Sequence, residues 1–192
     1  EQLSQQWNTP LIRIQHHHAH VLSAIAEHRL EGPVLGFAWD GTGFGTDGTV
    51  WGGEALLVND SQWTRAAHLR LFPLPGGDRA VREPRRSALG LLYECWGAAQ
   101  VGVVGNWFAE SELETLLQAL SQQRLFPRTS SMGRLFDAVA ALCGLSETAS
   151  FEGQAAMGLE FLADDCEGGR YDISLSDATP AVVDWQGIVE GV

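Results

Sequence analysis

The stretch DGTGFGTDGTVWGGE, from Asp40 to Glu54, is rich in glycine and lies between two segments with strand character. Residues 34–39 before it form an apolar run that is typical of a buried strand, and residues 50–58 form a second run of this kind. Asp-Gly pairs, which occur twice in the stretch, are strong turn signals. The stretch therefore predicts a hairpin in which the first strand ends at Asp40 and a glycine-rich turn follows.

The beginning of this stretch also has the composition of a phosphate site. Asp40, Gly41, Thr42 and Gly43 offer a carboxylate, a hydroxyl and unhindered backbone N–H groups, which suit a phosphate or the metal ion that accompanies it. The same residues could do no more than shape a turn, because Asp and Gly favour turns regardless of any ligand. Both interpretations stay open on the residues alone.

Strand and helix patterns alternate along the rest of the chain. The expected helices cover residues 18–28, 84–96 with Pro84 at the start, 132–142 and 152–163, a segment with a capping box at Ser111 and Glu114, and a segment from 186 onward. The expected later strands cover residues 171–175 and 181–185. This order, at a length of 192 residues, predicts one or two compact units of the mixed α/β class.

The histidines of QHHHAH, residues 15–20, are candidate metal ligands. His16 and His20 are four residues apart at the start of an expected helix, so they can share one face and chelate one ion. A solvated histidine cluster or an engineered tag would give the same local sequence pattern, although a tag is normally terminal and uninterrupted. Asp40, at the end of the expected buried strand, is the obvious third ligand.

Acidic and small residues farther along the chain carry weaker signals. Asp137, Glu152 and Gly153 lie near expected helices, where acidic groups usually only complement the helix dipole. Ser131 and Gly133 could likewise provide no more than a helix cap and a close approach between segments. None of these residues identifies a ligand by itself.

Charge and composition exclude several classes of protein. Twelve Lys and Arg stand against 24 Asp and Glu, a net charge of -12 with no basic run, which excludes nucleic acid as an expected partner. No apolar run approaches the ~20 residues that span a bilayer, and no signal peptide is visible, so no membrane role is expected. Cys95, Cys143 and Cys166 include no C-x-x-C pair and are interpreted as buried structural thiols of a cytoplasmic protein.

Taken together, several segments resemble the HypF family of carbamoyltransferases. These segments are QHHHAH, DGTGFGTDGTVWGGE, LPGGD, REPRRSALGLLYE, TSSMGRLFDAVAALCGL and FEGQAAMGLE. The resemblance covers nearly all of the chain and implies an actin/sugar-kinase/Hsp70-like (ribonuclease H-like) lobe with an added helical layer. Proteins of the family are several times longer, so residues 1–192 are expected to form an incomplete carbamoyltransferase domain.

The resemblance also implies the roles of individual residues. The expected parts are a metal-ligand helix at 1–33, a strand hairpin with a phosphate loop at 34–75, a mainly helical part at 76–170 and truncated returning strands at 171–192. By this resemblance His16, His20 and Asp40 are both metal ligands and catalytic residues. The implied nucleotide site consists of Asp40, Gly41, Thr42, Gly43, Gly133, Asp137, Glu152 and Gly153.

A reaction follows from the same resemblance. In the family, carbamoyl phosphate and ATP yield carbamoyl-adenylate, whose carbamoyl group passes to the C-terminal cysteine of the partner HypE for cyanide ligand synthesis in nickel-iron hydrogenase maturation. Zinc or iron suits the expected ligands, and magnesium could enter with the nucleotide. The isolated chain is expected to be inactive. The alternatives are a carbamoyltransferase that acts on a small-molecule hydroxyl and a non-catalytic docking domain.

Overall fold

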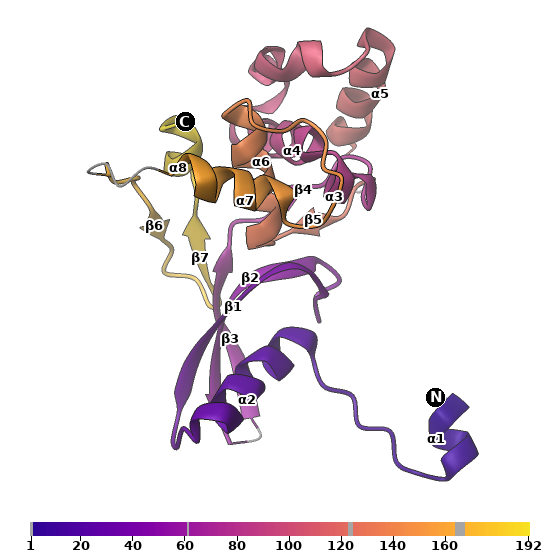
Figure 1. Cartoon of the computed structure of the whole chain (residues 1–192), viewed down its shortest axis with the longest axis vertical. Coiled ribbons are helices and arrows are strands. Elements are labelled where there is room, and N and C mark those ends of the chain that lie inside the picture. The colour runs from indigo at the N-terminus through magenta and orange to yellow at the C-terminus, as the bar shows by residue number, and fades with distance from the viewer. Residues whose placement is uncertain (1, 61, 123–124, 164–167) are drawn as a thin grey trace.

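The computed structural model describes residues 2–60, 62–122, 125–163 and 168–192. The described strands form one seven-stranded sheet, with α2 at one end and most other helices gathered at the other end (Figure 1). The helices are α1 (Gln2–Trp7), α2 (His16–His28), α3 (Arg79–Arg82), α4 (Pro84–Trp96), α5 (Glu110–Ser121), α6 (Met132–Leu142), α7 (Gln154–Leu162) and α8 (Gln186–Glu190), with 3-10 helices at Gly97–Ala99 and Val101–Trp107. The strands are β1 (Val34–Phe44), β2 (Val50–Asn59), β3 (Gln62–Leu69), β4 (Phe72–Pro73), β5 (Arg128–Thr129), β6 (Ser174–Leu175) and β7 (Ala181–Asp184). The predicted mixed α/β class is confirmed.

The predicted hairpin is present, but its first strand is longer than predicted. β1 runs antiparallel to β2 and continues to Phe44, with an irregular register between Trp39 and Gly43. The prediction that the strand ends at Asp40 is therefore wrong, and the turn lies at residues 45–49. Asp40 lies in the irregular part of β1, and irregularities of this kind re-aim a side chain out of the regular alternation of a strand.

Helix α2 covers one face of the hairpin. Val21 of α2 packs with Ala38, Leu56 and Val58 in a small core. A Cβ atom at Gly36 would lie 2.4 Å from Val21, so a residue without a side chain is required for the helix and the strand to approach this closely. The packing fixes α2 relative to β1, and these two elements carry the candidate metal ligands.

The opposite face of β1 is open. Leu35, Phe37 and Trp39 alternate with the residues that face α2, and their exposed fractions are 52%, 67% and 66%. Among the described strands, β1 pairs only with β2. The strand therefore presents both apolar side chains and unpaired backbone groups to its surroundings.

A second, larger core lies in the helical part. Its fully buried members include Phe72, Ala80, Ala88, Leu89, Leu91, Val104, Ala138 and Ala141. Ser131 caps α6 by accepting a hydrogen bond from the Arg134 backbone N–H at 3.1 Å, in agreement with the predicted start of this helix. The predicted capping box is wrong, because α5 begins at Glu110 after Ala109 and Ser111 lies inside its first turn.

The end of the chain returns to the sheet. β7 pairs in parallel with β3, and β6 adds to its other side. The structure shortens the predicted strand 171–175 to Ser174–Leu175, and it adds β3, which was not predicted because its sequence QWTRAAHL alternates poorly. α1 has no buried residue and lies apart from the rest of the molecule (Figure 1).

The cysteines are less buried than predicted. Cys95 is half-buried, and burial raises the pKa of its thiol to about 11, whereas Cys143 is exposed. Cys166 lies outside the described residues. Within the ranges that the structure describes, every helix is too short or too polar to cross a membrane.

Candidate metal centre and nucleotide site

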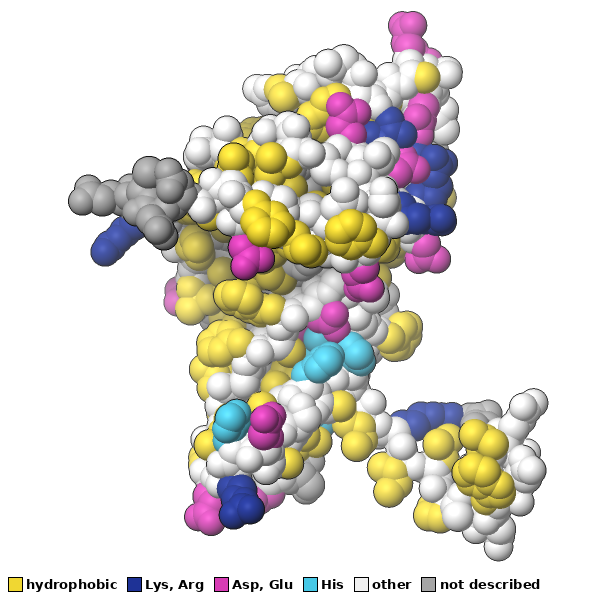
Figure 2. All heavy atoms as spheres, viewed as in Figure 1, with side chains coloured by type: hydrophobic (Ala, Val, Ile, Leu, Met, Phe, Trp, Pro, Cys, Tyr) yellow, Lys and Arg dark blue, Asp and Glu magenta, His cyan; other side chains and the backbone are white. Residues whose placement is uncertain are grey.

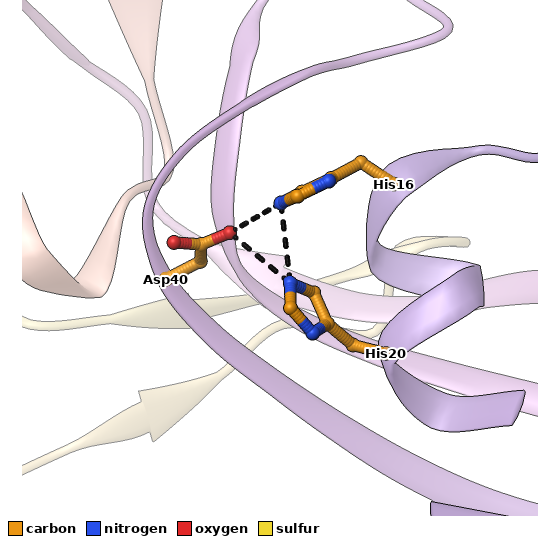
Figure 3. A group of neighbouring side chains, drawn as sticks. All are labelled: His16, His20 and Asp40. Carbon is orange, nitrogen blue, oxygen red and sulfur yellow. Dashed lines mark hydrogen bonds and ion pairs between the residues drawn. The ribbon is translucent and has the colours of Figure 1, made fainter. Parts of the chain in front are cut away.

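His16, His20 and Asp40 meet at one point between α2 and β1 (Figure 3). The Nε2 atoms of His16 and His20 are 3.1 Å apart. Asp40 Oδ2 lies 2.7 Å from Nε2 of His16 and 3.5 Å from Nε2 of His20. The structure thus brings the three residues together, and metal binding by them stays a prediction.

Local structure explains why they converge. Gln15 caps α2 by accepting the His18 backbone N–H at 2.9 Å, so the helix begins with the first candidate ligand, His16. One turn of helix places His20 on the same face. On the other side, the Ser131 hydroxyl lies 2.8 Å from the backbone carbonyl oxygen of Asp40, which ties this part of β1 to the start of α6.

The donor set fits a divalent metal ion. Two imidazole nitrogens and one carboxylate oxygen lie within 4.8 Å of one another. Ligand atoms at about 2.1 Å from a metal are roughly 3.0–3.4 Å apart in octahedral and tetrahedral sites, close to the separations seen here. The side chains of His16 and His20 are 50% and 54% exposed, so the cluster is open to a further ligand. Nitrogen and carboxylate donors suit zinc or iron.

Asp40 is held in its ionised form. Burial raises the pKa of this carboxyl group, but hydrogen bonds from His16 and from the backbone N–H groups of Gly41 and Thr42 lower it, and the net pKa lies below the ordinary value. The Gly41 N–H donates to Oδ1 of Asp40 at 2.6 Å. These two N–H groups, which were predicted to face a phosphate, are therefore bonded to Asp40 in this structure.

A third histidine, His17, lies beside the cluster and was not singled out from the sequence. It is completely buried, and burial lowers its pKa although the nearby Glu54 charge opposes this shift. A Cβ atom at Gly43 would lie 2.4 Å from Cε1 of His17 and 2.9 Å from Cδ2 of His16. Gly43 therefore allows the histidines to pack against β1. This structural role is sufficient to explain a glycine here without a phosphate.

Most of the predicted nucleotide residues gather on the other side of Asp40. A Cβ atom at Gly133 would lie 2.8 Å from the Cα atom of Gly41, so α6 begins in direct contact with β1. A Cβ atom at Gly41 would lie 3.5 Å from Oε1 of Glu152 and 3.6 Å from Nη2 of Arg134. Gly153 follows at the start of α7 with a φ of 78°. In Figure 2, histidine and acidic side chains adjoin on the surface near the middle of the molecule.

Asp137 lies deeper in this region, beside Arg134. Nη1 of Arg134 is 2.7 Å from Oδ2 of Asp137, but the two groups are not aligned as a hydrogen bond. Burial raises the pKa of Asp137 to about 6, an effect that Arg134 opposes and Glu152 increases. Arg134 was not predicted as a site residue, although it stands between two predicted ones in the chain.

The raised pKa predicts a specific dependence of stability on pH. The folded chain should hold an extra proton on Asp137 between about pH 4, near the pKa of an unfolded Asp, and about pH 6. The contribution of this group to the free energy of unfolding should therefore fall as pH rises through that window, by up to about 3 kcal/mol. A ¹³C NMR titration of the carboxyl carbon should give a midpoint near 6. Asp137→Asn should remove this contribution to the slope in urea denaturation, and an unchanged slope would contradict the assignment.

A buried charged network supports the hairpin behind the metal cluster. Arg65 donates from Nε to Glu54 Oε2 at 2.5 Å and from Nη1 to Asp47 Oδ2 at 2.9 Å. Ser130 donates to the other oxygen of Glu54. The Arg65 guanidinium also stacks 3.9 Å above the Trp51 ring. The network joins β2, β3, the hairpin turn and the segment before α6, and no sequence motif indicated it.

Comparison with protein families gives two matches. The model for the second subdomain of the carbamoyltransferase Kae1-like domain matches residues 36–192, and the model for the HypF Kae1-like domain matches residues 1–27. The chain is similar to carbamoyltransferase HypF2 of Cupriavidus necator, at 45% identity over 163 residues, or 85% of this chain and 20% of the relative. It is 40% identical over 201 residues to carbamoyltransferase HypF of Synechocystis, covering 95% of this chain and 26% of that protein.

Solved structures give the same result. The crystal structure of full-length HypF in the phosphate- and nucleotide-bound form superposes with a TM-score of 0.87 at 39% identity, over 99% of this chain and 30% of that chain. The structure of HypF from T. kodakarensis also gives a TM-score of 0.87, at 29% identity over 99% of this chain and 26% of that one. These matches show a Kae1-like domain and confirm the predicted fold, an incomplete actin/sugar-kinase/Hsp70-like lobe with an added helical layer. The chain spans less than a third of each of these four proteins.

Proposed function

Because this chain belongs to the HypF family of carbamoyltransferases, we propose that it forms part of a site that transfers a carbamoyl group from carbamoyl-adenylate to a protein thiol. The acceptor is the C-terminal cysteine of a HypE-type partner, and the product serves cyanide ligand synthesis in nickel-iron hydrogenase maturation. Carbamoyl phosphate and ATP supply the adenylate in the longer protein. The reaction takes place in the cytoplasm, where an acceptor thiol stays reduced.

The observation that carries this proposal is the convergence of His16, His20 and Asp40 beside Gly41 and Gly133. The three side chains hold a divalent metal, which when bound supplies a Lewis acid for the phosphate or carbonyl oxygen of the adenylate. Ionised Asp40 keeps its carboxylate available as a ligand because hydrogen bonds stabilise its charged form.

The surroundings of Gly41 suit the nucleotide. Gly133 lets α6 meet β1, because a Cβ atom there would lie 2.8 Å from the Cα atom of Gly41, and Gly41 has no side chain to keep a phosphate away from this part of the backbone. Asp137 and Glu152 provide carboxyl oxygens that can accept hydrogen bonds from ribose hydroxyls, and Gly153 lies next to Glu152 at the start of α7. The acceptor thiolate attacks the carbonyl carbon, a C–S bond forms, and AMP leaves with the electron pair of the broken C–O bond.

A chimaera tests the proposal. Residues 1–192 would replace the matching region of a full-length HypF relative, and transfer from carbamoyl phosphate and ATP to a HypE-type acceptor would be followed by mass spectrometry. The acceptor should gain one carbamoyl group on its C-terminal cysteine, whereas the 192-residue chain alone should give none. Loss of transfer in a chimaera that folds, while the unmodified relative stays active, would contradict the proposal. Transfer to a small-molecule hydroxyl in place of the thiol would favour the alternative carbamoyltransferase.

A further inference from the structure

His17 has a buried nitrogen with no hydrogen-bond partner beside the metal cluster. Its side chain is 0% exposed, and Nε2 makes no hydrogen bond to any described residue. Oδ2 of Asp40, an acceptor on the cluster, lies 4.0 Å from this nitrogen. A buried polar atom without a partner costs about 1–3 kcal/mol, which calls for a reason.

The cap of α2 determines which nitrogen of His17 carries the proton. Oε1 of Gln15 accepts the His18 backbone N–H at 2.9 Å, which orients the Gln15 amide. The amide nitrogen then points to Nδ1 of His17 at 3.0 Å and to the Phe44 carbonyl at 3.2 Å. An amide nitrogen can only donate, so Nδ1 accepts. In the neutral imidazole the proton must then lie on Nε2, the atom that faces Asp40.

We propose that His17 is a positioning residue for the metal ligand Asp40, to which its Nε2–H donates a hydrogen bond when the cluster holds a divalent ion. The hydrogen bond requires a shift of about 1 Å from the present separation. Oδ2 now accepts from His16 at 2.7 Å, a contact that metal binding must replace because Nε2 of His16 becomes a ligand. This inference rests on the metal site of the proposed function.

The geometry favours a donor over a third imidazole ligand. His17 follows His16 directly, so it points about 100° away around the helix. The ring centroids of His16 and His20 are 4.6 Å apart, whereas those of His17 and His20 are 6.4 Å apart. The ring of His17 instead packs against β1 at Gly43, and its centroid lies 6.0 Å from the centroid of the Trp51 ring. Hydrogen bonds to metal ligands from such neighbours orient the ligand and tune its basicity.

NMR of the unchanged chain tests the tautomer and the donor role directly. Long-range ¹H–¹⁵N spectra should show the proton of His17 on Nε2 before and after addition of Zn²⁺ alone. The Nε2 proton should move downfield and exchange more slowly with solvent once zinc is bound. Loss of this proton on zinc addition would make His17 a ligand and overturn the proposal, as would a proton on Nδ1 in the zinc-free chain.

Affinity measurements provide the second test. His17→Leu should weaken Zn²⁺ binding about 10–100-fold, and His17→Gln, which can place an amide N–H near the position of Nε2, should recover most of this loss. His18→Leu is the matched control, because His18 is also buried with an unpartnered Nε2 but packs against Trp63, with the ring centroids 5.4 Å apart. Equal affinity of the unchanged chain and His17→Leu would overturn the role of His17 alone. No zinc binding by the unchanged chain would overturn the proposed metal site, and this role with it.

Discussion

Alanine in place of His16 or His20 is expected to lower the affinity for Zn²⁺ by more than about 100-fold, since loss of a direct ligand should exceed the 10–100-fold cost of losing a neighbour of a ligand. The two nitrogens lie 3.1 Å apart and form two of the three donors of the cluster, so neither has a substitute among the described residues. Transfer to the acceptor thiol by the chimaera should fall with the metal content. Isothermal titration with Zn²⁺ measures the affinity, and elemental analysis of the purified protein measures the metal content. Mass spectrometry of the acceptor measures the transfer.

His28→Ala is the control for this experiment. His28 stands at the other end of the same helix and is exposed, so its loss removes one imidazole without touching the cluster. Far-UV circular dichroism should show that all three variants keep their helices. Full metal content and full transfer after the change at His16 would remove the metal centre from the mechanism and favour a docking role for the chain.

Arg65→Met is expected to destabilise the fold by about 3–5 kcal/mol, because it leaves the charge of Glu54 buried without its cation. The Glu54 side chain is 0% exposed, and Arg65 is its only ion-pair partner among the described residues. The change also removes the contact of Arg65 with Asp47 and its stacking on Trp51. Urea denaturation followed by tryptophan fluorescence measures the change in the free energy of unfolding.

A second arginine gives the matched comparison. Arg79 pairs with Glu83 at 2.7 Å, but its side chain is 60% exposed. Arg79→Met should therefore change the free energy of unfolding by no more than about 1 kcal/mol. Similar losses for the two variants would show that burial of Glu54 does not set the strength of the network, and would contradict the effect expected for Arg65→Met.

The parts of the site that sequence could predict depend on local spacing. His16 and His20 are four residues apart, and helical periodicity alone places them on one face. Asp40 was predicted as their neighbour because it follows an apolar run that is typical of a buried strand. It does meet them, although this strand is exposed on one face and continues beyond Asp40 to Phe44. The longer strand was missed because Asp-Gly pairs read as turns wherever they occur.

The parts that sequence could not predict depend on distant contacts. Arg65 reaches Ser130, 65 positions away, and no local pattern encodes that pairing. Arg134 was not predicted, although it lies between Gly133 and Asp137 in the sequence, because a single arginine near the start of a helix does not indicate a binding site. His17 was overlooked within a run of three histidines, since its role follows from the orientation of Gln15, which only coordinates reveal.

The open side of β1 has a practical consequence for anyone who purifies the chain. A strand with free backbone groups on one edge and Leu35, Phe37 and Trp39 on its face can template the addition of a strand from another molecule. At low ionic strength the net charge of -12 keeps copies apart by mutual repulsion. At physiological ionic strength, salt screens this repulsion between charges that are more than about 8 Å apart. Self-association is therefore expected to increase with salt, and dilute, low-salt conditions should favour single molecules for spectroscopy.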